Sequence, residues 1–313
     1  IGSISSEISG LNLLETFDEL SNPGVFVVGG AGNQGNTGIH YFGKIESIND
    51  VKDIIIQVGE QNSLDIIMEV RSLDKLGVQI ISPSGELSYI ANYTPENIVF
   101  TGDFNSENTK YSIYYTYPDL LLARQKVRVS LKDIKPGVWT LRVTPEFLVN
   151  GEFDLYLPNK NLLSEETKFV NPDSISTITK YSGGKNIITV GVFNDRTNSM
   201  WLGSSQGSKY GDFLKPDIVA PGVDIISTFI NNTYKVSTGS GISSSIATGV
   251  VALIIEYLIE QSQFTRLTLF PQVIKTYLML GAEKKDIYKY PNISQGYGII
   301  NLENTIREIA DNL

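Results

Sequence analysis

A segment rich in serine and glycine, residues 236–253, has the residue types of a reactive site at the start of a helix. Gly239 and Gly241 let the backbone turn sharply at low steric cost, and no charge follows Ile242 before Glu256. A helix that is apolar nearly all round is predicted to lie in the centre of a core. Its N-terminal N–H groups would point at whatever docks there. Enzymes place nucleophiles at such ends, because the same donors can hold an oxyanion.

A second polar loop is found at residues 29–35, Gly-Gly-Ala-Gly-Asn-Gln-Gly, directly after a short apolar run at residues 25–28. Such a run is typical of a buried parallel strand. Ligand sites in open α/β sheets lie beyond the carboxyl ends of these strands, so the amide of Asn33 could donate a hydrogen bond to a ligand. The alternative is a glycine-rich turn in which Asn33 is satisfied locally, and local sequence alone favours that alternative.

These two segments resemble the nucleophile and oxyanion-hole segments of the subtilisin-like (S8) serine proteases. The family motif is Gly-Thr-Ser, with a Gly inside the helix eight positions after the Ser, and its places are taken here by Gly239, Ser240, Gly241 and Gly249. Gly241 therefore stands where the nucleophilic Ser belongs. Asn33 matches the oxyanion Asn of the family.

The resemblance covers residues 1–40 and 169–313, and its most specific match is residues 215–225, Lys-Pro-Asp-Ile-Val-Ala-Pro-Gly-Val-Asp-Ile. It implies an α/β fold in which a parallel sheet has helices on both faces. The two prolines in the matched segment bracket an apolar run, which confines that strand to a sheet edge or to its very start. Apolar spacing and end signals predict helices over residues 8–20, 270–280 and 302–313.

The middle of the chain has a different pattern, because helical periodicity fades and turn signals multiply. About eight short strand-like runs predict an inserted antiparallel sandwich or jelly roll. Its aromatic side chains are expected in the core or rim rather than around a ligand. The eight strand-like runs are residues 54–58, 64–70, 78–81, 88–90, 111–117, 127–131, 138–143 and 153–157.

We therefore expect a first part of the subtilase core at residues 1–40, an inserted domain at 41–168 and the C-terminal part of the core at 169–313.

The insert, together with Ser-Ser-Ile-Ala-Thr-Gly-Val-Val in the central helix, resembles the Csp subgroup of subtilases from spore-forming anaerobes. The subgroup acts in germination, and its active members cleave the precursor of a cortex-degrading hydrolase. Others are regulatory pseudoproteases that lack triad residues, and Gly241 makes this chain resemble them. The resemblance implies the cortex or coat region of the bacterial spore as the location. Implied partners are an active Csp-type protease or other germination proteins, and a small-molecule germinant.

Two other readings stay open. The first is the C-terminal part of an active serine endopeptidase whose nucleophile Ser is replaced at Gly241. The second is a purely structural scaffold. Ile1 reads as the middle of a domain, so the catalytic Asp and His and a prodomain would precede it. The single His40 follows the Asn33 loop, whereas the catalytic His of subtilases precedes it, so His40 is expected to be structural.

Neighbouring serines are weak substitutes for the missing nucleophile. Each helical residue turns by about 100 degrees, which directs Ser243 and Ser244 away from position 241. Ser240 would have to move by a full backbone step. Ser245 is the fourth serine of this segment. We expect none of Ser240, Ser243, Ser244 and Ser245 to replace the nucleophile.

Composition narrows the function classes further. The chain has 313 residues, a net charge of -9 and a pI near 4.8, which argues against nucleic acid or an anionic membrane as main partner. The absence of cysteine excludes disulfides and thiol chemistry. We expect no membrane span, because the longest apolar run, residues 247–259, is interrupted by Glu256. No cofactor is identified, and no loop has the spacing of a recognised calcium site.

Overall fold

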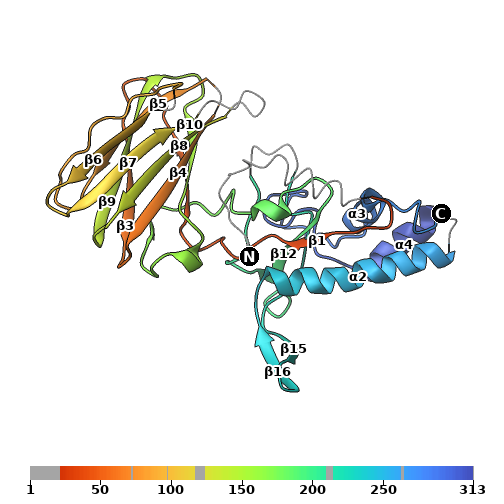
Figure 1. Cartoon of the computed structure of the whole chain (residues 1–313). Helices are drawn as coiled ribbons and strands as arrows, with labels where there is room; N and C mark the ends of the chain where they lie inside the picture. The colour runs from red at the N-terminus through yellow and green to blue at the C-terminus, as the bar shows by residue number, and fades with distance from the viewer. Residues whose placement is uncertain are drawn as a thin grey trace. The chain divides into compact units, whose positions relative to one another are not determined.

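The computed structural model describes residues 22–71, 73–96, 98–116, 124–208, 214–261 and 264–312. The helix expected over residues 8–20 lies outside these ranges. Internal contacts group the chain into two compact units, one of residues 1–36 with 174–313 and one of residues 37–173 (Figure 1). Residues 37–40 join the second unit because β2 (His40–Lys44) pairs with β10 (Glu152–Tyr156) and Leu157 N–H donates to the carbonyl of Ile39.

The first unit is built on a parallel sheet of three strands. β12 (Ile188–Asn194) lies in the middle and pairs in parallel with β1 (Val28–Gly30) and β14 (Ile218–Pro221). The short β13 (Ser199–Met200) adds to β12 in the antiparallel direction. The apolar run at residues 25–28 contributes only its last residue to β1, because the two following glycines continue the ladder with β12.

Among the named strands β14 pairs only with β12, and a single isolated bridge joins Val219 to Ile299 on its other side. Val219 donates its N–H to the carbonyl of Gly298 and accepts from the N–H of Ile300, on the side away from β12. The placement at a sheet edge that was expected from the two prolines agrees with this strand order. Pro216 precedes the strand and Pro221 is its last residue, so the missing N–H groups fall at the two ends of the ladder.

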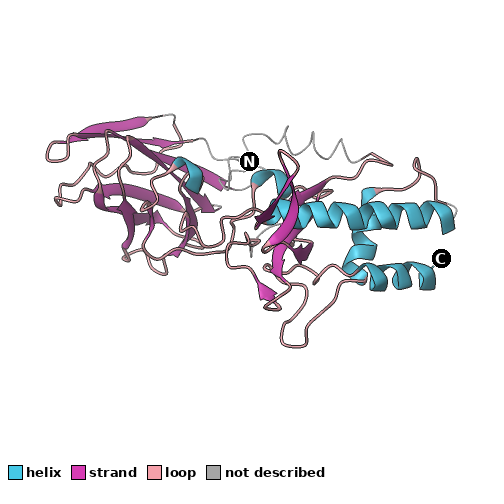
Figure 2. Ribbon diagram, turned by 90° about the horizontal axis from the view of Figure 1, so that it is seen from below, coloured by secondary structure: helices cyan, strands magenta, loops and turns pink. Residues whose placement is uncertain are grey.

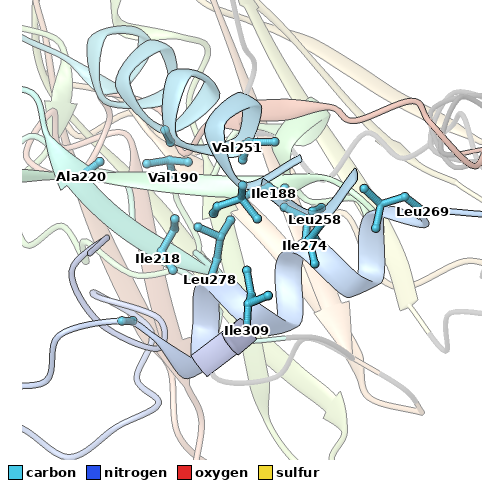
Figure 3. Packing of buried hydrophobic residues seen from close by; sticks show 13 residues of the cluster. Ile188, Val190, Ile218, Ala220, Val251, Leu258, Leu269, Ile274, Leu278 and Ile309 are labelled. Carbon is cyan, nitrogen blue, oxygen red and sulfur yellow. The ribbon is translucent and has the colours of Figure 1, made fainter. Parts of the chain in front are cut away.

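The three described α-helices share one hydrophobic cluster on one face of this sheet (Figure 3). α2 (Ser240–Gln261) packs on β1, β12 and β14, and α3 (Pro271–Leu280) and α4 (Leu302–Asn312) pack on α2. Helices on both faces were expected, but no α-helix on the other face belongs to the described residues. There Phe193, Val219 and Ile299 form a smaller cluster.

The central helix is buried along one stripe only, contrary to the expectation of a fully enclosed helix. The buried positions recur at helical spacing, whereas Leu253 is 49% exposed. The buried residues of α2 are Ser240, Ser243, Ala247, Val251, Ile254 and Leu258.

By length and composition α2 is apolar enough to cross a membrane, with a mean hydropathy of 1.9 over its most apolar window. The expectation that Glu256 interrupts the apolar run is therefore wrong. The same composition suits a helix packed on a sheet, which is how α2 lies.

A two-stranded hairpin connects β14 to α2. It consists of β15 (Ile225–Phe229) and β16 (Thr233–Ser237), paired in the antiparallel direction. Asn231 and Asn232 both have positive φ, which is the requirement of the tight turn that suits the twist of hairpin strands. The hairpin ends two residues before Gly239 and so leads directly into the start of α2.

The second unit is almost entirely strand (Figure 2) and consists of two antiparallel sheets with the orders β2-β10-β4-β8-β7-β6 and β11-β3-β9-β5. The rings of Phe104 and Trp139, one from each sheet, meet edge to face at 5.4 Å. Tyr115 donates its hydroxyl to the carbonyls of Leu76 and Ala91. The other strands are β3 (Lys52–Val58), β4 (Ser63–Arg71), β5 (Lys75–Ile81), β6 (Val99–Phe104), β7 (Thr109–Tyr115), β8 (Arg124–Lys132), β9 (Gly137–Phe147) and β11 (Lys168–Phe169).

Seven of the eight expected runs in this unit coincide with strands, whereas residues 88–90 do not form one. Isolated bridges at Leu87 and Ala91 flank that segment instead. β2, β6 and β11 were not expected, since their short or mixed sequences carry little alternation of apolar and polar residues. The antiparallel sheets agree with a sandwich, and the jelly-roll topology stays a prediction.

Candidate functional site

The loop that carries Asn33 is fixed to the rest of the first unit by backbone contacts. Ala31 N–H donates to the carbonyl of Val190 on β12, and Gly35 N–H donates to the carbonyl of Gly203. A Cβ at Gly35 would lie 2.2 Å from the carbonyl oxygen of Ser204, so only glycine allows this approach. The loop therefore lies at the carboxyl end of β1, where ligand sites of α/β sheets are expected.

The Asn33 loop meets the start of α2 through reciprocal hydrogen bonds. The backbone N–H of Ser240 donates to Asn33 Oδ1 at 2.8 Å, and the N–H of Gly32 donates to Ser240 Oγ at 3.1 Å. Because its oxygen accepts from Ser240, the amide of Asn33 keeps Nδ2 as a donor, and this atom has no hydrogen-bond partner among the described residues. The structure thus brings together the two segments that the sequence singled out 207 residues apart.

Gly239 makes the tight approach between these segments sterically feasible. Its φ is +146°, and a Cβ there would lie 2.9 Å from Asn33 Nδ2. Its N–H donates to the carbonyl of Gly222 at the end of β14, which fixes the beginning of α2 to the sheet. The glycine thus serves both the turn and the placement of Asn33.

Gly241 occupies an open position in the first turn of α2. A Cβ built there meets no heavy atom within 4 Å, and its φ is outside the left-handed region. The position could therefore accept a side chain, but the chain supplies none. No hydroxyl is available at 241 for nucleophilic attack or for a hydrogen bond to a base.

The neighbouring serine hydroxyls are engaged elsewhere. Ser243, which is fully buried, donates to the carbonyl of Ala220 at 3.0 Å. Ser244 and Ser245 both donate to the carbonyl of Gly241, at 3.0 and 2.8 Å. Ser240 Oγ accepts from Gly32, and its side chain is buried. All four hydroxyls therefore stabilise the start of α2.

His40 is enclosed in the second unit. Its imidazole is 0% exposed, with Nε2 3.0 Å from Asp154 Oδ1 and the ring against Tyr156. A buried ring in a strand gives a substrate no access, so this geometry supports a structural role.

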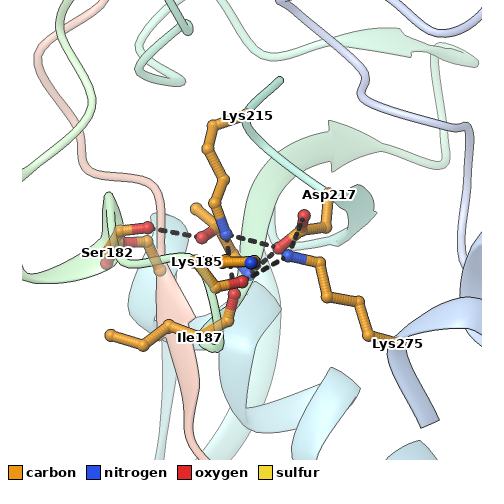
Figure 4. Close-up of polar contacts among 8 residues, drawn as sticks. Ser182, Lys185, Ile187, Lys215, Asp217 and Lys275 are labelled. Atoms are coloured by element: carbon orange, nitrogen blue, oxygen red, sulfur yellow. Dashed lines mark hydrogen bonds and ion pairs between the residues drawn. The ribbon is translucent and has the colours of Figure 1, made fainter. Parts of the chain in front are cut away.

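A buried charged cluster connects β12, β14 and α3 within the first unit (Figure 4). Asp217 Oδ2 accepts from Lys215 Nζ at 2.8 Å and from the N–H of Thr189 at 2.7 Å, while Oδ1 lies 2.8 Å from Lys275 Nζ. Lys215 also donates to the carbonyl of Ile187 at 2.7 Å. Sequence reasoning missed this cluster, although the Lys-Pro-Asp spacing places two of its members on one segment.

The electrostatics of the cluster are dominated by desolvation. Burial lowers the pKa of Lys215 from 10.5 to about 8, and the attraction of Asp217 offsets only part of that effect. Asp217 is 1% exposed and has two cationic neighbours. The cluster is closed by its own contacts, which indicates a structural role. Among the described residues, no group of three or more His, Asp or Glu side chains could hold a metal ion.

The Asn33 loop and the start of α2 thus lie side by side at one end of the parallel sheet. Residues 159–299 match the subtilase family. A stretch of 152 residues is 34% identical to the serine protease AprX of Bacillus subtilis (strain 168), which covers 43% of this chain and 33% of AprX. The subtilase match includes Gly241 but ends before α4 and does not extend to Asn33.

The structure is also similar to that of the CspB protease of Clostridium perfringens. The TM-score is 0.89 at 24% sequence identity, covering 100% of this chain and 65% of the CspB chain. The chain thus has a subtilase-like fold that it shares with the matched part of the CspB chain. It spans less than two thirds of the length of either relative.

Proposed function

We propose that the chain is part of a catalytically inactive, subtilisin-like pseudoprotease. The observation that carries the proposal is Gly241, which has no side chain at the start of α2, beside the amide of Asn33. Removing the nucleophile of a model subtilase lowers kcat by roughly 10^6. The hydroxyls of the nearby serines are engaged in hydrogen bonds to Gly32, Ala220 or Gly241, so none of them is placed to substitute.

The proposed role is regulation in bacterial spore germination. It is supported by the likeness to CspB and by the resemblance of the sequence to the Csp subgroup. In this proposal the protein acts as the pseudoprotease CspC does, and controls an active Csp-type protease that processes a cortex-lytic hydrolase. The surface around Asn33 and the second unit would serve as recognition surfaces. A small-molecule germinant and a location in the spore cortex or coat belong to the same proposal.

A second candidate is the C-terminal part of an active subtilisin-like serine endopeptidase whose nucleophile is replaced at Gly241. The open space at this position favours it, because a serine side chain would fit without moving a neighbour. The donors of an oxyanion hole also remain, since the N–H of Gly241 and Asn33 Nδ2 have no hydrogen-bond partner among the described residues. This candidate predicts proteolysis once serine is restored at 241.

The decisive test is fluorophosphonate labelling of the full-length wild-type protein, read by intact mass, beside an active subtilase as positive control. The pseudoprotease proposal expects no adduct on wild type. A wild-type adduct would contradict it, and the labelled residue would then be mapped. The Gly241→Ser variant distinguishes the candidates further, because labelling and cleavage gained by this one change favour the replaced nucleophile.

A further inference from the structure

A cavity of about 490 Å³ lies in the first unit and is separate from the site of Asn33 and Gly241. None of its lining residues belongs to the Asn33 loop or to α2. Its volume falls in the range of small-molecule sites, roughly 300 to 1,000 Å³. The lining includes Met200, Tyr288, Ile293, Gln206, Gln295 and Lys289.

Two glutamine side chains in the wall are oriented by hydrogen bonds to their oxygens. Gln206 Oε1 accepts from Ser294 Oγ at 3.0 Å, and Gln295 Oε1 accepts from the hydroxyl of Tyr290 at 2.6 Å. Neither Nε2 has a hydrogen-bond partner among the described residues. Gln295 is only 3% exposed as a residue, yet its Nε2 is not among the buried unpartnered atoms, so this donor reaches the open space of the cavity. The two amides therefore offer donors to a ligand in the cavity.

The loop that carries Gln295 is held rigid by the amide of Asn292. Asn292 Oδ1 accepts from the N–H groups of Ser294 and Gln295, at 3.0 and 2.8 Å, and Nδ2 donates to the carbonyl of Lys289 at 2.9 Å. Asn292 and Gly296 also exchange two backbone hydrogen bonds. The donors are thus placed before any ligand arrives, which reduces the entropy lost on binding.

The charge and the apolar atoms of the wall define the ligand further. Among the described lining residues Lys289 is the only charged one, and none of them carries a carboxylate that would repel an anion. Met200, Tyr288 and Ile293 offer apolar surface beside the donors. We propose that this cavity binds a small organic carboxylate with an apolar or aromatic body. Its carboxylate accepts from Gln206, Gln295 and Lys289, and its body lies against the apolar side chains.

Titration of the 15N-labelled full chain with phenylacetate and, separately, with hexanoate tests this proposal. The side-chain NH2 signals of Gln206 and Gln295 are followed, and phenylacetamide and hexanamide serve as uncharged analogues. We expect saturable shifts with at least one carboxylate, and about tenfold weaker binding of its amide, because hydrogen bonds to an ionised acceptor are the stronger ones. Saturation by neither carboxylate, or equal affinity for acid and amide, would overturn the proposal.

Matched lysine variants show where the carboxylate binds. Lys289→Gln removes the cation of the cavity, whereas Lys284→Gln removes an exposed lysine of the same segment that is not part of the lining. We expect Lys289→Gln to weaken carboxylate binding about fivefold to tenfold and to leave amide binding unchanged. Lys284→Gln should leave both unchanged. Equal losses in the two variants would indicate a non-specific charge effect and would also overturn the proposal.

Discussion

The side-chain oxygen of Asn33 accepts a hydrogen bond from the backbone N–H of Ser240 at 2.8 Å. This contact fixes the Asn33 loop to the first turn of α2 and orients the amide nitrogen as a free donor. A side-chain amide donor therefore lies beside the start of α2, close to Gly241, which has no side chain. The contact also stabilises the fold, so retention of Asn33 does not require catalysis.

Substitution of Asn33 should separate its two hydrogen-bonding roles. Asn33→Ala removes the acceptor for Ser240 N–H and is expected to lower the free energy of unfolding by about 1 kcal/mol. Asn33→Asp keeps an acceptor, now charged and near a helix N-terminus, and should be within about 0.5 kcal/mol of wild type at pH 7. Urea unfolding of both variants measures this. Equal losses would show that the Ser240 contact does not stabilise the loop.

Gly241→Ser should be tolerated, since a Cβ at 241 meets no atom within 4 Å. Serine has a better helix propensity than glycine, so we expect stability equal to wild type or higher by about 0.5 kcal/mol. Gly239→Ala is the matched control, because Cβ at φ +146° would lie 2.9 Å from Asn33 Nδ2. It should cost about 1 to 3 kcal/mol. Urea unfolding measures both variants. An equal loss of unfolding free energy in the two would contradict the open space around position 241.

Asp217→Ala should be strongly destabilising, because it leaves Lys215 buried without its carboxylate partner. Breaking a buried pair from one side costs about 3 to 5 kcal/mol. Asp224→Asn, which removes the charge of the exposed pair with Arg196 and keeps a residue type suited to the positive φ at this position, should cost less than about 1 kcal/mol. Thermal and urea unfolding of the two variants compare the losses. A loss below about 1 kcal/mol for Asp217→Ala would mean that the cluster is not a structural element.

The stability of the first unit should depend on pH through Lys215. Burial lowers its pKa in the folded state to about 8 from 10.5, so above pH 8 the unfolded state binds more protons at this lysine. Stability contributed by this group therefore rises between about pH 8 and 10.5, by an amount of order 1 to 3 kcal/mol. Lys215→Met should remove this rise.

The pH prediction is read as the difference in unfolding free energy between wild type and Lys215→Met at pH 7.5, 9 and about 10.5. Taking the difference cancels the titration of other lysines and of the tyrosines, which both proteins share. A difference that stays constant over this range would show that Lys215 keeps its ordinary pKa in the fold. Asp217 keeps Lys275 as a partner in the variant, which favours folding of the control.

Local sequence patterns were enough to predict much of the fold. The spacing of apolar residues predicted α3 and α4, and the Pro-bracketed motif and the alternating runs predicted β14 and most strands of the second unit. The resemblance to the subtilisin-like family, rather than local pattern alone, identified Asn33 and Gly241 as the positions of interest. Local patterns work because helical and strand periodicity and turn chemistry depend on residues that are close in sequence.

Only the tertiary structure decided which of these segments meet. The hydrogen bond between Asn33 and Ser240 joins residues 207 positions apart. Asp217 pairs with Lys215, which precedes β14, and with Lys275 of α3. The apolar composition of α2 predicted complete burial, but the packing of the described residues covers one stripe. Burial and ion pairing depend on which surfaces come together in space, and periodicity along the chain carries no information about that.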